Sequence, residues 1–284
     1  MKKILCPTDF SDTSEKAVAY AVAIAQQAGA HLLLLHVVHL PIVDTSETAL
    51  VASELLSEQM RFAENKLSAM CSQINSVVGA TDSAGFTCDY VVKEALLTDV
   101  ARHLTKEQGY DLIVMGTTGC DNTVEELLIG SNTEAVMEEV KSPVLSVPTT
   151  AVMPPVFRKI IYASDYDQED KLAIAEVIKL GSLFNADIDV VHVIKEADET
   201  IEEKDAAVLN DLHESFPGVP LSFQVVVNKR RDDGLRDYYS KANGNMMVVL
   251  RREKGFLKEL FSQSLAEKLT YQAEVPLLVL HGKK

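Results

Sequence analysis

The sequence predicts an α/β protein made of two domains of the same plan, each a parallel sheet covered by helices on both faces. Three observations predict it. The chain has 284 residues, about twice the roughly 150 residues of one domain. One pattern of segments occurs twice along it. Within each copy, short apolar strands alternate with longer amphipathic helices, which is typical of βαβ units and a parallel sheet.

The repeat is visible in the first two strands of each copy. Lys3–Asp9 returns as Lys159–Asp165, and Leu34–Val38 returns at the same offset as Val190–Ile194. The remaining matches come at shorter offsets, and they pair Asp111–Met115 with Met246–Leu250 and Ser142–Leu145 with Val275–Leu278.

A short linker separates the two copies. Pro148, Pro154 and Pro155 cluster there, and proline interrupts both helices and central strands. We therefore expect one domain over residues 1–150 and a second over 156–284.

The elements of the first copy follow from hydrophobic periodicity. A first helix is expected after Asp12, because Glu15 stands three residues on in capping-box spacing. Asp167 and Asp170 repeat this cap in the second copy. The stretch 47–77 predicts a long second helix whose apolar side contains Leu55, Leu56, Met60, Ala63, Leu67 and Met70. The five strands are expected near residues 2–7, 31–38, 86–92, 111–115 and 143–147.

Charge and composition exclude several classes of function. The net charge is −15, so the surface as a whole repels nucleic acid and anionic lipid. No apolar run reaches the roughly 18 residues of a membrane span, and we expect a cytoplasmic protein. The cysteines Cys6, Cys71, Cys88 and Cys120 show no CxxC spacing, which favours buried, reduced thiols over a disulfide framework or a zinc site.

Two loops are expected to form a ligand site, because open parallel sheets bind ligands at the carboxyl ends of their strands. One loop follows the first strand and contains Asp9. The other follows the fourth strand, with Gly116 and Gly119, and runs to Gly130 and Ser131. Glycines permit close approach and positive φ, and the free N–H groups of a helix start attract anions. The sequence therefore predicts a phosphate-binding nest in an otherwise acidic protein.

Individual residues of this site keep two interpretations. Ser131 either caps its own helix, with Glu134 in capping-box spacing, or also binds a phosphate. Asp9 either caps the loop before the first helix, or bonds a ribose hydroxyl or helps to hold Mg²⁺. The position of His36 on an apolar strand favours a packed histidine over a ligand. His36 and His39 face opposite sides of a strand, so they cannot chelate one metal.

With these motifs the chain resembles the universal stress protein family in tandem form. The resemblance rests on five segments: Pro7–Ser11, Leu35–Val37, Met115–Gly119, Gly130–Ser131 and Ser142–Val144. The family's ATP motif is G-x2-G-x9-G-[ST]. Here Gly116 and Gly119 match it, the spacer before Gly130 holds one residue more, and we assign that residue to the 120–123 loop.

The resemblance implies a stress-response, ATP-binding regulatory protein. It implies flavodoxin- or Rossmann-like domains with strand order 3-2-1-4-5, paired through their last strands as an intrachain pseudo-dimer. It places Asp9 by the ribose and the Val37 backbone by the adenine. The phosphates would meet Gly116, Gly119, Gly130 and Ser131, and the same loops bring in Pro7, Thr8, Met115 and Asn132.

The second copy lacks this site. Gly116 corresponds to Arg251, Gly119 to Lys254 and Gly130 to Gln263, so side chains stand where backbone would meet phosphate. We expect one nucleotide per chain, an unidentified protein partner and, beyond the intrachain pair, a homodimer as an open alternative. A scaffold without a ligand and a slow ATPase remain the competing functions. No Walker A sequence supports the ATPase.

Overall fold

The structure is a computed structural model that describes residues 1–38, 46–79, 85–117, 131–166, 170–195, 210–212, 214–251 and 275–282. Of residues 46–52, 79 and 131 it describes the backbone alone. The described chain divides into two compact units, the first ending at Thr149 and the second beginning at Thr150.

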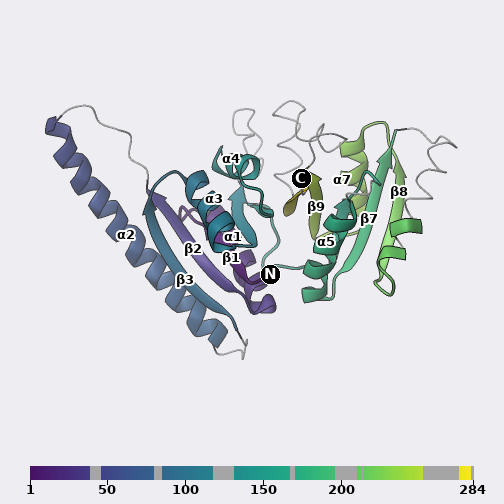
Figure 1. Ribbon diagram of the computed structural model, residues 1–284, viewed down its shortest axis with the longest axis horizontal. Coiled ribbons are helices and arrows are strands. Elements are labelled where there is room, and N and C mark those ends of the chain that lie inside the picture. Colours follow the sequence, from purple (N-terminus) through teal and green to yellow (C-terminus); the bar gives the residue numbers. More distant parts are fainter. Residues whose placement is uncertain are drawn as a thin grey trace. The chain divides into compact units, whose positions relative to one another are not determined.

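The first unit contains a parallel sheet with the strand order β3-β2-β1-β4-β5 among the described residues, as the family resemblance implies (Figure 1). The central strand β1 pairs in parallel with β2, where Lys3 lies beside His31, and with β4, where Ile4 lies beside Leu112. The strands are β1 (Lys3–Pro7), β2 (His31–Val38), β3 (Thr87–Glu94), β4 (Leu112–Thr117) and β5 (Val144–Pro148).

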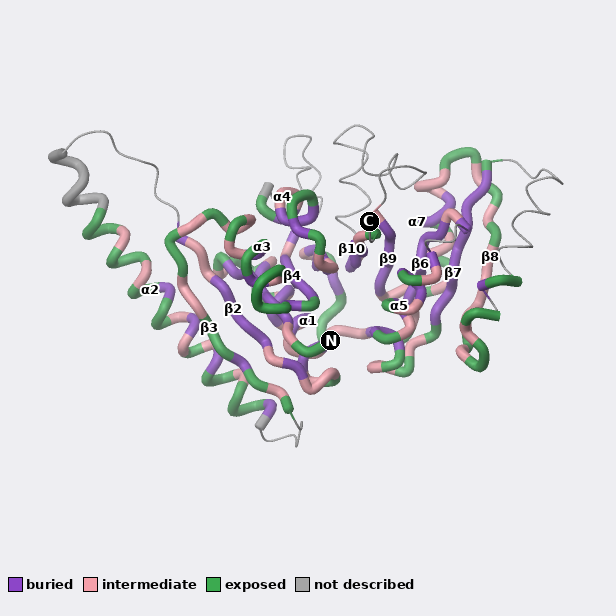
Figure 2. Tube along the Cα trace, in the orientation of Figure 1, coloured by how far each residue is buried: buried purple, intermediate pink, exposed green. Residues whose placement is uncertain are grey.

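Helices cover this sheet. α1 packs on β1, β4 and β5, while α2 packs on β2 and β3. Strands β1, β2, β4 and β5 are buried over much of their length, whereas the outermost strand β3 is largely exposed and the helices expose one side (Figure 2). The helices are α1 (Asp12–Ala28), α2 (Ser46–Gly79), α3 (Leu97–Gln108) and α4 (Ser131–Glu139).

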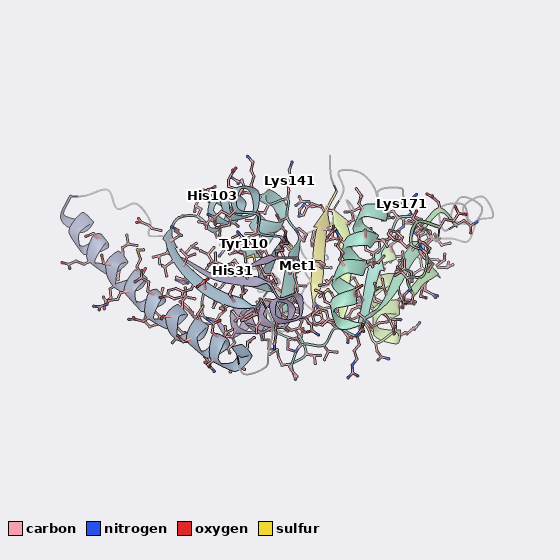
Figure 3. All side chains as sticks on the ribbon, turned by 60° about the horizontal axis from the view of Figure 1, so that its bottom comes forward. Met1, His31, His103, Tyr110, Lys141 and Lys171 are labelled. Atoms are coloured by element: carbon pink, nitrogen blue, oxygen red, sulfur yellow. The ribbon has the colours of Figure 1, made fainter. Side chains whose placement is uncertain are left out.

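Aromatic and charged side chains occupy the end of the first sheet where the strands begin. The rings of His31 and Tyr110 lie 6.2 Å apart between centroids, and Figure 3 shows them side by side. The ammonium of Lys3 stands 5.5 Å from the centroid of the Tyr110 ring. These contacts stabilise the amino edge of the sheet and leave the carboxyl edge to the candidate site.

The second unit repeats the strand order. Its described strands are arranged β10-β9-β6-β7-β8, which is again 3-2-1-4-5 when numbered within the unit. The predicted pairing of the two domains through their last strands stays a prediction. The elements are β6 (Lys159–Ala163), α5 (Asp170–Phe184), β7 (Asp187–Ile194), β8 (Leu221–Val227), α7 (Arg231–Lys241), β9 (Met246–Arg251) and β10 (Leu277–His281).

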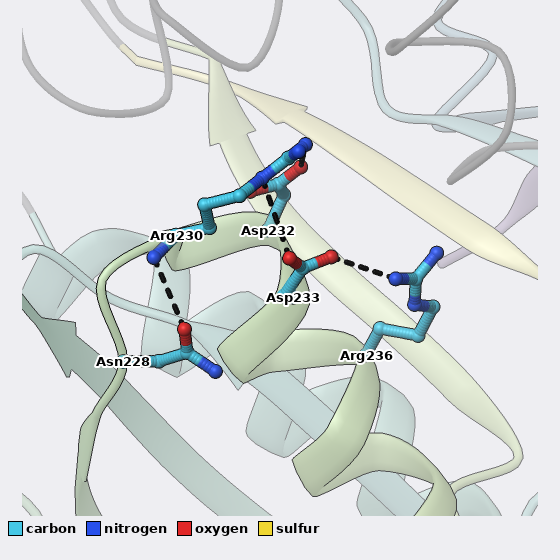
Figure 4. Close-up of polar contacts among 5 residues, drawn as sticks. All are labelled: Asn228, Arg230, Asp232, Asp233 and Arg236. Carbon is cyan, nitrogen blue, oxygen red and sulfur yellow. Dashed lines mark hydrogen bonds and ion pairs between the residues drawn. The ribbon is translucent and has the colours of Figure 1, made fainter.

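Arg230, which directly precedes α7, is paired with two acidic residues in the first turn of that helix. Arg230 pairs with Asp232 at 2.8 Å and with Asp233 at 3.3 Å, and Arg236 pairs with Asp233 at 2.6 Å. The Asn228 side chain accepts the Arg230 N–H (Figure 4). The arginines therefore organise a helix start.

The N-cap of the first helix was predicted one residue too far toward the C-terminus, at Asp12. Ser11, not Asp12, is the N-cap of α1, and its hydroxyl accepts the N–H of Ser14 at 3.3 Å. Ser11 also donates its N–H and its hydroxyl to Asp9 Oδ1. These bonds fix Ser11 before the first turn, so Asp12 lies in the helix as an acidic first-turn residue.

Asp170 begins α5, but the structure gives its side chain a different role from the predicted cap. It is fully buried and accepts the hydroxyls of Tyr162 at 2.5 Å and Ser164 at 2.6 Å. In the first unit, Cys6, Thr8 and Ser14 occupy the corresponding positions, where the hydroxyls of Thr8 and Ser14 bond each other at 2.9 Å. A buried carboxylate thus replaces a serine.

Replacing Asp170 with Ala should cost more stability than any single change to its donors. It leaves two buried hydroxyls without an acceptor, at roughly 1–3 kcal/mol each, whereas Tyr162→Phe removes one bond worth about 1 kcal/mol. Urea unfolding of the two variants measures the difference. Equal losses for Asp170→Ala and Tyr162→Phe would show that Asp170 does not hold this cluster together.

Candidate functional site

The loop after β1 is fastened to the end of β2. The N–H of Thr8 donates to the carbonyl of Leu35 at 2.8 Å, and Nδ1 of His36 lies 2.8 Å from the carbonyl oxygen of Thr8. The Thr8 hydroxyl in turn accepts the N–H of Phe10 at 3.1 Å. Phe10 is held in the left-handed region, with φ of 67°, which is uncommon for a residue with a side chain. The chain is thereby turned so that Phe10 stacks on His36.

Asp9 is exposed at this turn and bound on one side. Its Oδ1 accepts the N–H of Ser11 at 3.0 Å and the hydroxyl of Ser11 at 2.5 Å. Partial burial opposes the charge, but the hydrogen bonds from Ser11 and Ser14 outweigh it, so the pKa of Asp9 lies below its ordinary value. Asp9 is therefore a stable carboxylate at neutral pH and accepts hydrogen bonds from hydroxyl groups.

A pocket of about 720 Å³ opens beside Asp9, between the carboxyl end of β2 and the helix α2. The end of β2 contributes His36, Val37 and Val38. The volume is in the range of sites for small molecules and cofactors. The other described residues that line it are Asp9, Phe10, Leu55, Glu58, Gln59, Arg61, Phe62 and Asn65.

Aromatic rings form one wall of the pocket. Phe10 stacks on His36 with centroids 4.6 Å apart, and Phe62 meets Phe10 edge-on at 6.3 Å. Phe62 keeps 61% of its surface exposed, and Leu55 keeps 46%. Leu55 is one of the residues that we had expected on the buried side of this helix. Their exposure has a location in common, since both side chains line this pocket.

The second part of the site lies at the end of β4. β4 extends to Thr117, two residues beyond the predicted end. Gly116 has no positive φ, and a Cβ there would stand 2.6 Å from the carbonyl oxygen of Thr13 in α1. Of the two expected reasons for this glycine, positive φ was wrong for Gly116, whereas close approach is confirmed: the missing side chain permits close packing of β4 on the first turn of α1.

The start of α4 is tied to the same strand end. The Thr133 hydroxyl donates to the carbonyl of Gly116 at 3.0 Å, which places the first turn of α4 beside β4. The Thr117 hydroxyl is buried and has no hydrogen-bond partner among the described residues. A helix start and a buried hydroxyl thus stand together at this strand end.

The structure places the predicted site residues in two groups. Thr8, Asp9 and Val37 lie at the ends of β1 and β2, with Pro7 buried as the last residue of β1. Met115 and Gly116 lie at the end of β4, and Ser131 and an exposed Asn132 begin α4. Gly119 and Gly130 lie outside the described residues.

Sequence reasoning missed the contribution of α2 to the pocket. Its periodicity assigned the apolar residues to one buried side, so Phe62, Glu58 and Arg61 attracted no attention. The signal that could have found Phe62 was its position off that apolar side, since a large aromatic residue on a polar face favours a binding surface.

The second unit repeats the loop geometry, but its aromatic side chain takes a different position. Ser164 donates its N–H to the Val191 carbonyl, His192 bonds the Ser164 carbonyl, and Tyr166 stacks on His192. These contacts reproduce those of Thr8, His36 and Phe10. Tyr166, however, is only 5% exposed, and its hydroxyl donates to the carbonyl of Gln224 in β8. Arg251 ends β9, as the alignment predicts, and Lys254 and Gln263 lie outside the described residues.

The described residues offer no cluster of three or more His, Cys, Asp or Glu side chains suited to a metal ion. Asp9 is the single carboxylate at the turn after β1, which fits Mg²⁺ only as an ion carried by a ligand's phosphates. In the same described part of the chain, no helix combines the length and apolar character needed to cross a bilayer.

Asp9→Asn should lower the thermal stability at neutral pH, because the amide keeps the shape but loses the charge that Ser11 and Ser14 stabilise. A carboxyl whose pKa is depressed by folding contributes stability above its unfolded pKa, and this contribution is lost as pH falls through the folded pKa. The melting curves of the two proteins should therefore converge in acid. A gap that widens in acid, or an Asp9 resonance titrating above its ordinary pKa in NMR, would contradict this assignment.

Comparison with known proteins agrees with the fold and with the repeat. A model of the universal stress protein family matches residues 1–148 and again residues 157–281. Universal stress protein MJ0577 of Methanocaldococcus jannaschii is 28% identical over 153 residues, covering 51% of this chain and 94% of that protein. Universal stress protein MJ0531 of the same organism is 32% identical over 152 residues, covering 51% and 81%.

Among solved structures, a universal stress protein from Archaeoglobus fulgidus superposes with a TM-score of 0.70 at 17% identity, covering 99% of this chain and 97% of that one. At this identity the likeness concerns the fold alone. Together with the two matched segments, it confirms the α/β class and the family resemblance. The chain belongs to the universal stress protein family and contains two segments of that family in tandem.

Proposed function

We propose that the first domain binds an adenine nucleotide such as ATP, and that the protein is a stress-response regulatory protein whose partner or shape changes with this ligand. The observation that carries the proposal is the open pocket at the carboxyl ends of β1 and β2; the glycine at the end of β4 and the start of α4 lie at the same edge of the sheet. Ligands of open parallel sheets bind at this edge.

The base and the ribose fit the part of the site next to α2. The backbone of Val37 would meet the adenine edge, and Phe62 offers an exposed ring face to the base. Asp9 has a second carboxylate oxygen and a depressed pKa, so it suits the hydroxyls of a ribose. The pocket volume leaves room for both groups.

The phosphates would lie toward β4 and α4. Backbone N–H groups of Gly116, Gly119, Gly130, Ser131 and Asn132 are the proposed donors, since the N-terminus of a helix favours negative charge. The buried Thr117 hydroxyl supplies one more donor at this place. Neutral donors of this kind suit a protein of net charge −15, and any Mg²⁺ would come with the nucleotide.

The second domain is proposed to bind no nucleotide. Tyr166 fills the place that Phe10 leaves open, and its hydroxyl is bonded to β8. Arg251, Lys254 and Gln263 replace the three glycines of the motif. We therefore infer one nucleotide per chain.

ATP should raise the melting temperature of the wild type, because a hundredfold excess over Kd adds about 2.7 kcal/mol to the free energy of unfolding. Gly130→Val should remove this rise, because a branched side chain would enter the phosphate position, and Gln263→Ala should not change it. Phe62→Ala should weaken binding roughly fivefold, since ring stacking contributes about 1 kcal/mol.

Val77→Ala is the matched control for Phe62→Ala. Val77 is 62% exposed on the same helix and does not line the pocket among the described residues, so its loss should leave the affinity unchanged. Calorimetric titration gives the stoichiometry. Two equivalent sites, or a site that persists in Gly130→Val, would contradict the proposal, and no binding at all would favour the scaffold.

We expect little hydrolysis of the bound nucleotide. Asp9 is the carboxylate at the turn after β1, and its low pKa makes it a weak general base, because a base works best with a pKa near the operating pH. Phosphate release measured under steady state should stay far below the typical enzyme range of roughly 1–1000 per second. Turnover within that range that Asp9→Ala abolishes would identify an ATPase instead.

A further inference from the structure

Two buried thiols meet between α2 and β3 in the first unit. Cys71 of α2 and Cys88 of β3 are 5% and 4% exposed, and their Sγ atoms lie 3.0 Å apart. No sequence pattern predicts this pair, because the spacing of 17 residues matches no thiol motif.

The pair is held in place by the backbone around it. The side chain of Asn75, one turn further along α2, donates to the carbonyl of Cys88 at 2.9 Å and accepts the N–H of Cys88 at 3.1 Å. This two-point contact fixes the register of α2 on β3. The two thiols therefore face each other because the contacts of Asn75 hold α2 against β3 in this register.

The two sulfurs differ in chemistry. The hydrogen bond from the Cys88 thiol lowers the pKa of Cys71, against partial burial and the charge of Asp89. The same hydrogen bond and burial raise the pKa of Cys88. Because the thiolate is the nucleophile, the lowered pKa favours Cys71 as the attacking thiol and Cys88 as the resolving thiol, and the 3.0 Å contact between the two Sγ atoms brings them within reach of each other.

We propose that Cys71 and Cys88 form an oxidative modification site, at which a small peroxide converts the two thiols into an intramolecular disulfide. The Cys71 thiolate attacks one oxygen of hydrogen peroxide, the O–O bond breaks, and a sulfenic acid and hydroxide form. The Cys88 sulfur then attacks the sulfenic sulfur, and the hydroxyl leaves. With the thiol protons included, two thiols and one hydrogen peroxide give one disulfide and two waters.

The geometry needs little rearrangement. A disulfide bond is about 2.0 Å long, so the sulfurs must approach by about 1 Å. Their burial admits a small peroxide more readily than a bulky disulfide such as oxidised glutathione. The new bond would fasten α2, whose residues up to Asn65 line the pocket, to β3.

The test exposes the folded full-length chain to hydrogen peroxide, removes the peroxide, unfolds the chain in denaturant so that an alkylating reagent reaches every remaining thiol, and maps the peptides by mass spectrometry. Two of the four cysteines should become resistant to alkylation until reductant is added, and one peptide pair should contain Cys71 joined to Cys88. The melting temperature should rise on oxidation and return with dithiothreitol. Oxidised glutathione at the same concentration should react more slowly.

Single variants separate the two roles. Cys71→Ser should abolish the disulfide, while Cys88→Ser should leave a sulfenic acid at position 71 that dimedone traps. Cys120→Ser is the control and should keep the joined peptides. If a buried variant fails to fold, the wild-type peptide map decides alone. Four alkylatable thiols after peroxide, or a bond that includes Cys6 or Cys120, would overturn the proposal.

Discussion

The hydrogen bond from Thr8 to the carbonyl of Leu35 is the constraint on which the site depends. It brings the loop after β1 onto the end of β2, and the bond between His36 and the Thr8 carbonyl completes the attachment. The second unit repeats both bonds through Ser164 and His192. The two units therefore share the same loop attachment, and they differ in the aromatic side chain that follows it, which is Phe10 in the first unit and Tyr166 in the second. Phe10 lines an open pocket, whereas Tyr166 is buried and its hydroxyl is bonded to β8.

The fold was predictable because it depends on patterns that recur over long segments. The alternation of apolar strands with amphipathic helices fixed the order of elements, and the repeat of Lys3–Asp9 as Lys159–Asp165 fixed the number of domains. Boundaries were less certain, since they depend on single hydrogen bonds. Ser11 rather than Asp12 caps α1 because Asp9 holds Ser11 in place. Ser11 and Asp12 are neighbours, and both residue types are preferred at N-caps, so a sequence pattern cannot tell which of them caps the helix.

The site was predictable where the chain carries a motif, as at Asp9 and Gly116, and not where it is formed by packing. Gly116 is needed because Thr13 of α1 leaves no space for a Cβ, a reason that appears only when the two elements meet. Phe62 enters the pocket from a helix with no motif. The Cys71–Cys88 contact likewise exists only once α2 lies on β3.

We propose that one open pocket, in the first domain, holds the nucleotide base. Photolabelling with an azido-adenine nucleotide tests it most directly, because the label attaches where the base lies. We expect the modified peptides to come from the end of β2 or from the pocket-lining turns of α2, between Leu55 and Asn65, and excess ATP to prevent the labelling. Specific labelling of peptides around Tyr166 or β8, displaced by ATP, would contradict it.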